Sequence, residues 1–256
     1  MASNNSEIII PQEMWLKKST ITFFKRNQAT VMAPQVIHLC SSDVIRTMAS
    51  TFEVVSRDCH YITIAARTIL ADRVSRKIYQ EEEVFKAEQE IARQFERVND
   101  YFDKMIAQAG EKIRLSGNDP AAIPSNLQAY GARCSTRASK DYLDVIKKAD
   151  MYLTLIDYLW IMGELSDTQT ESLNARLSNQ RAARSQILSI PKKTTAQFQL
   201  INRICKGAME QRQQERRAQS ERDKQRAQEE KQRVASNQVE LDHVATGVPA
   251  NQEAAA

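Results

Sequence analysis

Residues that make tight turns are scarce in this chain, which has 6 Gly and 6 Pro among its 256 residues. All-β sandwiches and barrels need many tight turns, and those turns rely on Gly and Pro. Doubly wound α/β enzymes use Gly where their loops cradle phosphates. Both classes are therefore disfavoured. We predict a mainly α protein, a helical bundle with long helices, a minor N-terminal β-ribbon and an extended charged C-terminal helix.

Strand character is confined to the first 40 residues. Ile8–Ile10 is a short β-branched run, and Ser19–Lys25 alternates Thr20 and Thr22 with Ile21 and Phe23. A period of two with β-branched and aromatic residues is typical of a half-buried strand. Pro34, in the stretch that follows, argues against a third long strand there.

Ser42 or Asp43 is expected to cap a helix that starts with Val44. Helical character then continues, with one break near Cys59 or Tyr61, to about Ile113. Within it, five apolar residues recur at steps of 4, 3, 4 and 3, in the manner of a heptad repeat. They are Ile91, Phe95, Val98, Phe102 and Met105. The seam is too short for a convincing zipper, so it favours an intramolecular helical hairpin over an intermolecular coiled coil.

The second half of the chain carries clear start and stop signals. A helix with apolar residues from Tyr142 to Trp160 is expected to end at Gly163, a good C-terminal cap. Ser166–Gln169 matches a capping box for the next helix. We expect Pro191 to stop that helix.

Thr194 or Thr195 is then expected to cap a further helix. These signals divide the chain into six segments. They are an N-terminal arm (1–17), a strand with a long helical region (18–114), a linker loop (115–125), a C-terminal helical region of the same domain (126–207), a charged helix (208–235) and a disordered tail (236–256).

The net charge of +4 comes from a single segment. Arg203–Arg233 contains ten Lys or Arg and six Asp or Glu. This stretch could neutralise DNA phosphates, and we name Arg212, Arg216 and Arg217 as backbone contacts. The alternative is a solvated helix whose charges mostly cancel, because acids are interleaved throughout.

Motifs that carry enzyme chemistry are missing from the sequence. It has no phosphate-cradling Gly loop, GxSxG, CxxC or HExxH, and only three His. The adjacent Cys59 and His60 do not fit a common zinc spacing. We therefore expect no catalytic residues, no metal, no cofactor and no small-molecule substrate.

Localisation signals are equally scarce. No run approaches the roughly 18 apolar residues that span a bilayer, and no signal peptide is visible. The four Cys are scattered, which does not suggest a disulfide framework. A cytoplasmic bacterial protein without membrane contacts is expected.

The N-terminal strand is the candidate for base readout. In ribbon-helix-helix dimers, one strand from each subunit pairs into a two-stranded ribbon that enters the major groove. If Ile21 and Phe23 face the core, then Lys18, Thr20 and Thr22 face outward and can read base edges. The phosphate contacts would come from Lys17, Lys25 and Arg26.

An ordinary edge strand is the alternative reading of the same pattern. About 17 residues separate Lys25 from Asp43, whereas a compact ribbon-helix-helix protein passes directly from strand to helix.

The order of these features resembles the AcaB-like proteins of conjugative plasmids and integrating conjugative elements, over roughly residues 18 to 207. The resemblance rests on Thr20–Arg26, Glu82–Val84, Pro124–Tyr130, Tyr142–Asp144, Tyr152–Leu155 and Gly163–Leu165. It implies a homodimeric bacterial regulator of transcription that binds double-stranded DNA through a ribbon-helix-helix element. The competing function is a non-enzymatic helical scaffold or accessory protein of a conjugative or phage apparatus, acting through protein–protein contacts.

Overall fold

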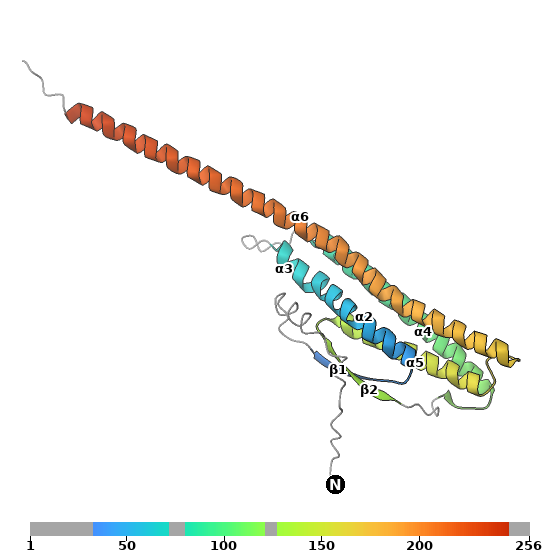
Figure 1. Cartoon of the computed structure of the whole chain (residues 1–256). Coiled ribbons are helices and arrows are strands. Elements are labelled where there is room, and N and C mark those ends of the chain that lie inside the picture. The colour runs from blue at the N-terminus through green and yellow to red at the C-terminus, as the bar shows by residue number, and fades with distance from the viewer. Residues whose placement is uncertain (1–32, 72–79, 121–126, 246–256) are drawn as a thin grey trace, which may run out of the picture. The chain divides into compact units, whose positions relative to one another are not determined.

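The computed structural model describes residues 33–71, 80–120 and 127–245 (Figure 1). The predicted strand at 19–25 and the run at 8–10 lie outside these residues. The described residues divide into two compact units, one ending at Cys205 and the other beginning at Lys206. The elements are β1 (Ala33–Leu39), α2 (Ser42–His60), the π-helical turn η2 (Tyr61–Ala65), α3 (Ala66–Leu70), α4 (Glu81–Leu115), β2 (Gln128–Cys134), α5 (Arg137–Ile161) and α6 (Gln169–Ala245). The mainly α fold class is confirmed.

The sheet has two antiparallel strands, with Ala33 opposite Cys134 and Leu39 opposite Gln128. Side chains alternate along β1, so that Ile37 and Leu39 are buried while their neighbours are exposed. Both strands contact α5. The sheet is therefore a small layer laid on the helices of the first unit.

Pro34 lies inside β1, so the expectation that it prevents a strand there is wrong. In a two-stranded sheet each strand has one open edge, where the missing N–H of a proline costs no ladder hydrogen bond. The strand β2 is also a correction, because helices alone were expected in residues 126–207. Its partner β1 lies about 95 residues earlier, beyond the reach of local sequence patterns.

The helix that begins at Ser42 does not end near Tyr61. Its hydrogen-bond pattern changes there to a π-helical turn, and helix continues to Leu70. Ser41 is the N-cap, one residue before the first of the two residues expected to cap this helix. The predicted break thus corresponds to a change of helical period.

Four of the five residues of the heptad-like seam of α4 are buried within the chain, and Met105 is partly exposed. Ile91, Phe95, Val98 and Phe102 are all at most 5% exposed, and α4 packs along α5. The Phe95 ring meets Tyr142 edge-on, and Phe102 contacts Tyr152. The intramolecular interpretation of the seam is therefore confirmed.

The caps of α5 follow from local chemistry. Thr136 and Ser139 form a reciprocal capping box at its start. At its end, Gly163 has a φ of 76°, and the N–H of Glu164 reaches back to the Leu159 carbonyl. This left-handed glycine closure confirms the predicted cap.

The start of α6 lies slightly later than predicted. The Thr168 hydroxyl, rather than Ser166, accepts the N–H of Glu171. Ser166 instead donates to the Glu171 carboxylate. Two overlapping segments, Ser166–Gln169 and Thr168–Glu171, match the capping-box pattern, and the sequence alone does not distinguish between them.

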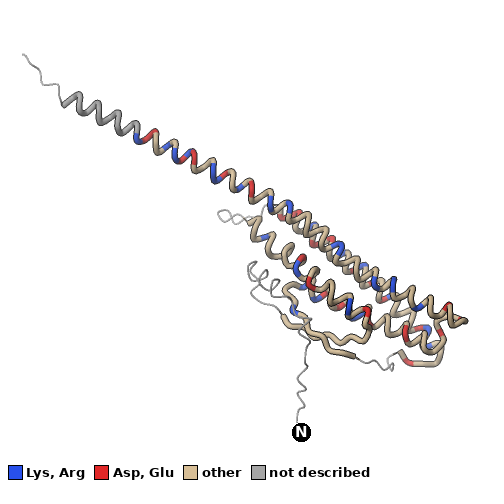
Figure 2. Tube along the Cα trace, viewed as in Figure 1, with Lys and Arg blue, Asp and Glu red and all other residues tan. Residues whose placement is uncertain are grey.

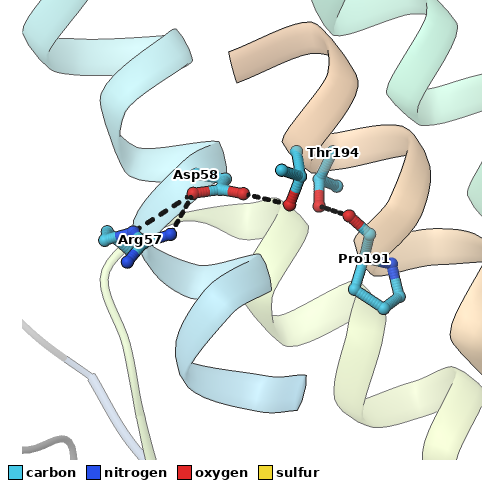
Figure 3. Close-up of polar contacts among 5 residues, drawn as sticks. Arg57, Asp58, Pro191 and Thr194 are labelled. Atoms are coloured by element: carbon cyan, nitrogen blue, oxygen red, sulfur yellow. Dashed lines mark hydrogen bonds and ion pairs between the residues drawn. The ribbon is translucent and has the colours of Figure 1, made fainter. Parts of the chain in front are cut away.

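Pro191 does not stop α6, and neither Thr194 nor Thr195 caps a new helix. The Thr194 hydroxyl donates to the Pro191 carbonyl, while Thr195 donates to the buried Asp58 carboxylate of α2 at 2.7 Å (Figure 3). Ile190 and Ile201, which lie before and after Pro191, are both buried inside the first unit. Tertiary packing therefore outweighs the cost of a mid-helix proline.

No helix among the described residues combines the length and apolar character that crossing a membrane requires.

Candidate nucleic-acid interface

The side chains predicted to contact DNA fall into two groups. Those of the N-terminal strand and its flanks lie outside the described residues: Lys17, Lys18, Thr20, Thr22, Lys25 and Arg26. Those of the C-terminal segment lie on α6, in the second unit: Arg212, Arg216 and Arg217.

A buried carboxylate holds the junction between β1 and α2. Asp150, on α5, is 4% exposed and accepts the backbone N–H groups of Cys40 at 3.0 Å and Ser41 at 2.7 Å. These residues join β1 to α2. The carboxylate also lies at the N-terminus of α2, where a negative charge is favourable. We call this arrangement the Asp150 clasp.

The Cys40 side chain completes the clasp. Its thiol contacts the Asp150 carboxylate at 3.3 Å and the Thr154 hydroxyl at 2.8 Å. Burial raises the pKa of this thiol, which keeps it protonated and able to donate. The clasp was not predicted, although an Asp on an otherwise apolar helix face was a signal for it.

The second unit is helix α6 from Lys206 onward. Cations and acids alternate along it (Figure 2). Arg216 and Arg217 are exposed and Arg212 is partly exposed. Side chains of like charge can still share one face, because each residue turns the helix by about 100°.

Four cations of this helix lie within a sector about 40° wide, with 100° per residue. We call them the basic stripe: Lys206, Arg217, Lys224 and Lys231. Gln213 and Ser220 fill the intervening positions near the same sector. Arg217 was among the predicted contacts, whereas the other three members were not singled out.

The other two predicted cations lie on a different face. Arg212 and Arg216 are roughly 80–120° from the stripe, in a sector that also holds Asp223 and Glu230. Neighbouring acids reduce the attraction of these arginines for phosphate. The 40° sector of the stripe holds no acid, although Glu210 and Glu221 lie about 20–40° beyond one of its edges, so the stripe is the narrowest alignment of cations on the second unit.

No family model matches this chain, and no curated protein matches it either. The arrangement of helices and sheet is similar to a solved structure, that of AcaB from uropathogenic E. coli. The TM-score is 0.50 at 22% sequence identity, over 64% of this chain and 81% of that chain. At this identity the likeness shows a shared fold.

Proposed function

We propose that this chain is a non-enzymatic, DNA-binding regulator of transcription from a bacterial conjugative element. The observation that carries the proposal is the fold shared with AcaB, which agrees with the resemblance of the sequence to AcaB-like proteins. In this proposal, the chain binds double-stranded DNA as a homodimer in the bacterial cytoplasm.

Base readout is assigned to the N-terminal ribbon, with Lys18, Thr20 and Thr22 on its outward face. Threonine can donate to or accept from base edges, and its methyl group can contact thymine. The pairing of β1 with β2 supports this assignment, because it fixes Ala33, the residue through which the preceding chain enters β1. A ribbon rooted at a fixed point loses less conformational entropy on binding.

Sequence-independent affinity is assigned to the second unit. The basic stripe places its last three cations about 10 Å apart along one face. Such cations neutralise phosphates and release counterions without reading sequence.

The first experiment measures duplex binding of the full chain by fluorescence anisotropy at several salt concentrations. We expect affinity to fall steeply as salt rises, because phosphate contacts release counterions. Absence of binding at low salt would contradict the proposal and favour the scaffold function instead.

A second experiment locates the readout once selection from a random duplex library has given a target. Thr20→Ala and Thr22→Ala should each cost about 1–3 kcal/mol of discrimination at one base pair, with little change in melting temperature. Phe23→Ala is the contrasting variant, since loss of a core phenylalanine costs about 3–5 kcal/mol of folding free energy. Threonine variants that bind the target as the unchanged protein does would remove the ribbon from the mechanism.

A further inference from the structure

A groove of about 1,090 Å³ lies in the first unit, away from the face that holds α6. One wall is the end of α2 with η2, the other is the first half of α4, and the beginning of α5 completes it. Its deep apolar residues are Cys59, Ile91 and Phe95, each at most 5% exposed. This shape can accept a short peptide segment.

Two polar atoms at the groove have no hydrogen-bond partner, although both are buried. They are Oδ1 of Asn99 on α4 and Oγ of Ser135 just before α5. A buried polar atom without a partner costs about 1–3 kcal/mol. An occupant that carries backbone N–H and C=O groups as well as apolar side chains would satisfy both.

The charges around the groove favour a peptide over a phosphate. Three acids and three bases line it, and both of its lysines are already paired. Lys147 lies 3.2 Å from Asp144, and Lys148 lies 2.6 Å from Asp103. The groove therefore presents little net charge with which to attract an anion.

The described chain begins beside this groove. Ala33, the first residue of β1, pairs with Cys134, and the next residue after Cys134 is Ser135, which lines the groove. The preceding 32 residues are attached at this point. They contain two apolar clusters outside the predicted strand, Ile8–Ile10 and Met14–Leu16.

The chain between Ala33 and residues 8–16 is long enough to let those residues reach the groove. Lys17 lies sixteen positions before Ala33, and an extended chain of that length spans up to about 50 Å. The strand at 19–25 would remain free to pair with another strand.

We propose that residues 8–16 dock in this groove of their own chain. The strand at 19–25 would then be anchored on both sides, by the docked segment before it and by the pairing of β1 with β2 after it. The inference is independent of DNA binding, since it concerns the free protein.

The test places the photo-crosslinking residue p-benzoylphenylalanine at position 92 of the full chain. Ala92 is exposed and lines the groove. A matched control carries the same residue at position 185, because Ser185 is exposed on α6 and does not line the groove. Irradiation without DNA is followed by trypsin digestion, which releases residues 1–17 as one peptide, and by mass spectrometry.

We expect position 92, but not position 185, to link to the 1–17 peptide in a product of single-chain mass. A link in a product of twice that mass would show that a second copy fills the groove and would overturn the proposal. Linkage to any other peptide, or a yield no higher than the control, would also overturn it.

The variant Ile9→Asp tests whether residues 8–16 are the part of the N-terminal segment that occupies the groove. Ile9→Asp places a charge in the apolar part of the docked segment and should lower the cross-linking yield at least fivefold, while circular dichroism stays unchanged. An unchanged yield in this variant would contradict docking through residues 8–16. Loss of DNA binding has no bearing on either readout, so the two proposals fail separately.

Discussion

Asp150 is an acid on the buried face of α5, among residues such as Ala149 and Leu153 that are fully apolar. A carboxylate in such a place needs hydrogen-bond donors, and the backbone of Cys40 and Ser41 provides them. One side chain therefore joins the strand–helix junction at the beginning of the fold to a helix more than 100 residues later.

Asp150→Ala should lower the free energy of unfolding by about 2–4 kcal/mol, because it removes charged hydrogen bonds and leaves buried N–H groups without acceptors. Urea denaturation measures the change. Glu111→Ala is the control, since its pair with Arg114 is exposed on both sides and contributes less than about 1 kcal/mol. Equal effects of the two substitutions would contradict the structural importance of the clasp.

Tyr152 gives the fold a dependence on alkaline pH. Burial raises its pKa to about 12, from an ordinary value of 10, and its hydroxyl donates to Asn179 of α6 at 2.7 Å. The folded state therefore keeps this proton where the unfolded state loses it. The stability that Tyr152 contributes is complete below pH 10 and decreases as pH rises toward 12.

Tyr152→Phe should be less stable than the unchanged protein by about 1 kcal/mol at pH 7, through loss of one hydrogen bond. The difference should shrink between pH 10 and pH 12, because the variant has no proton to lose there. Urea denaturation at both ends of this range checks it. A constant difference across the range would show that Tyr152 does not titrate as described.

At the scale of elements, local sequence signals predicted most of the helices but not the sheet. The periodic apolar faces of α4 and α5, and the cap at Gly163, could be identified from the sequence because residues three and four apart determine them. The pairing of β1 with β2 depends on contacts between distant segments. Pro191 shows the same limit, since the contact of Thr195 with Asp58 and the burial of Ile190 hold that helix together.

Of the candidate interface, the sequence identified the region but not the face. Arg212, Arg216 and Arg217 were chosen for their density of charge, whereas a continuous helix separates them by direction. The four cations of the basic stripe align because residues 206–231 lie in one continuous helix. The charged helix expected at 208–235 already implies this alignment, so helical periodicity applied to the sequence was a sufficient signal for the stripe.

The element-scale prediction compares two fourfold variants with equal loss of charge. Replacing the basic stripe (Lys206, Arg217, Lys224 and Lys231) with Gln should weaken binding to all duplexes about equally and lower the salt slope, each lost phosphate contact removing about 0.9 from it. The matched control replaces Arg212, Arg216, Arg222 and Arg226 with Gln.

Fluorescence anisotropy over a salt series measures both variants. We expect the control to retain more of its affinity, because its arginines spread over a sector about 120° wide and cannot all face one duplex. Equal losses would mean that net charge matters and that the face does not. Loss of discrimination between target and random DNA in the stripe variant would place readout in the second unit.

At the scale of the whole molecule, the proposed ribbon requires a second chain. Within the described residues, β1 takes β2 as its partner, so the pairing of β1 on that edge is already complete. A strand at 19–25 would need a partner of its own, because unpaired strand backbone groups are costly when buried. A second copy supplies one by symmetry.

We therefore expect light scattering at micromolar concentration to give twice the 29.2 kDa of one chain. A single-chain mass at that concentration would count against a ribbon formed between two subunits. The apolar seam of α4 packs inside the chain. Val98→Ala should therefore lower the free energy of unfolding and leave any dimer contact at the ribbon unaffected.

The distance between β1 and β2 along the chain has a consequence during synthesis. Strand β2 is made about 95 residues after β1, and Asp150 follows later still. At 5–20 residues per second, the ribosome needs roughly 5–20 s to supply the partner strand. During that interval β1 lacks its partner strand, so the nascent chain exposes the apolar side chains of Ile37 and Leu39. Chaperones that bind exposed apolar segments can bind β1 at this stage.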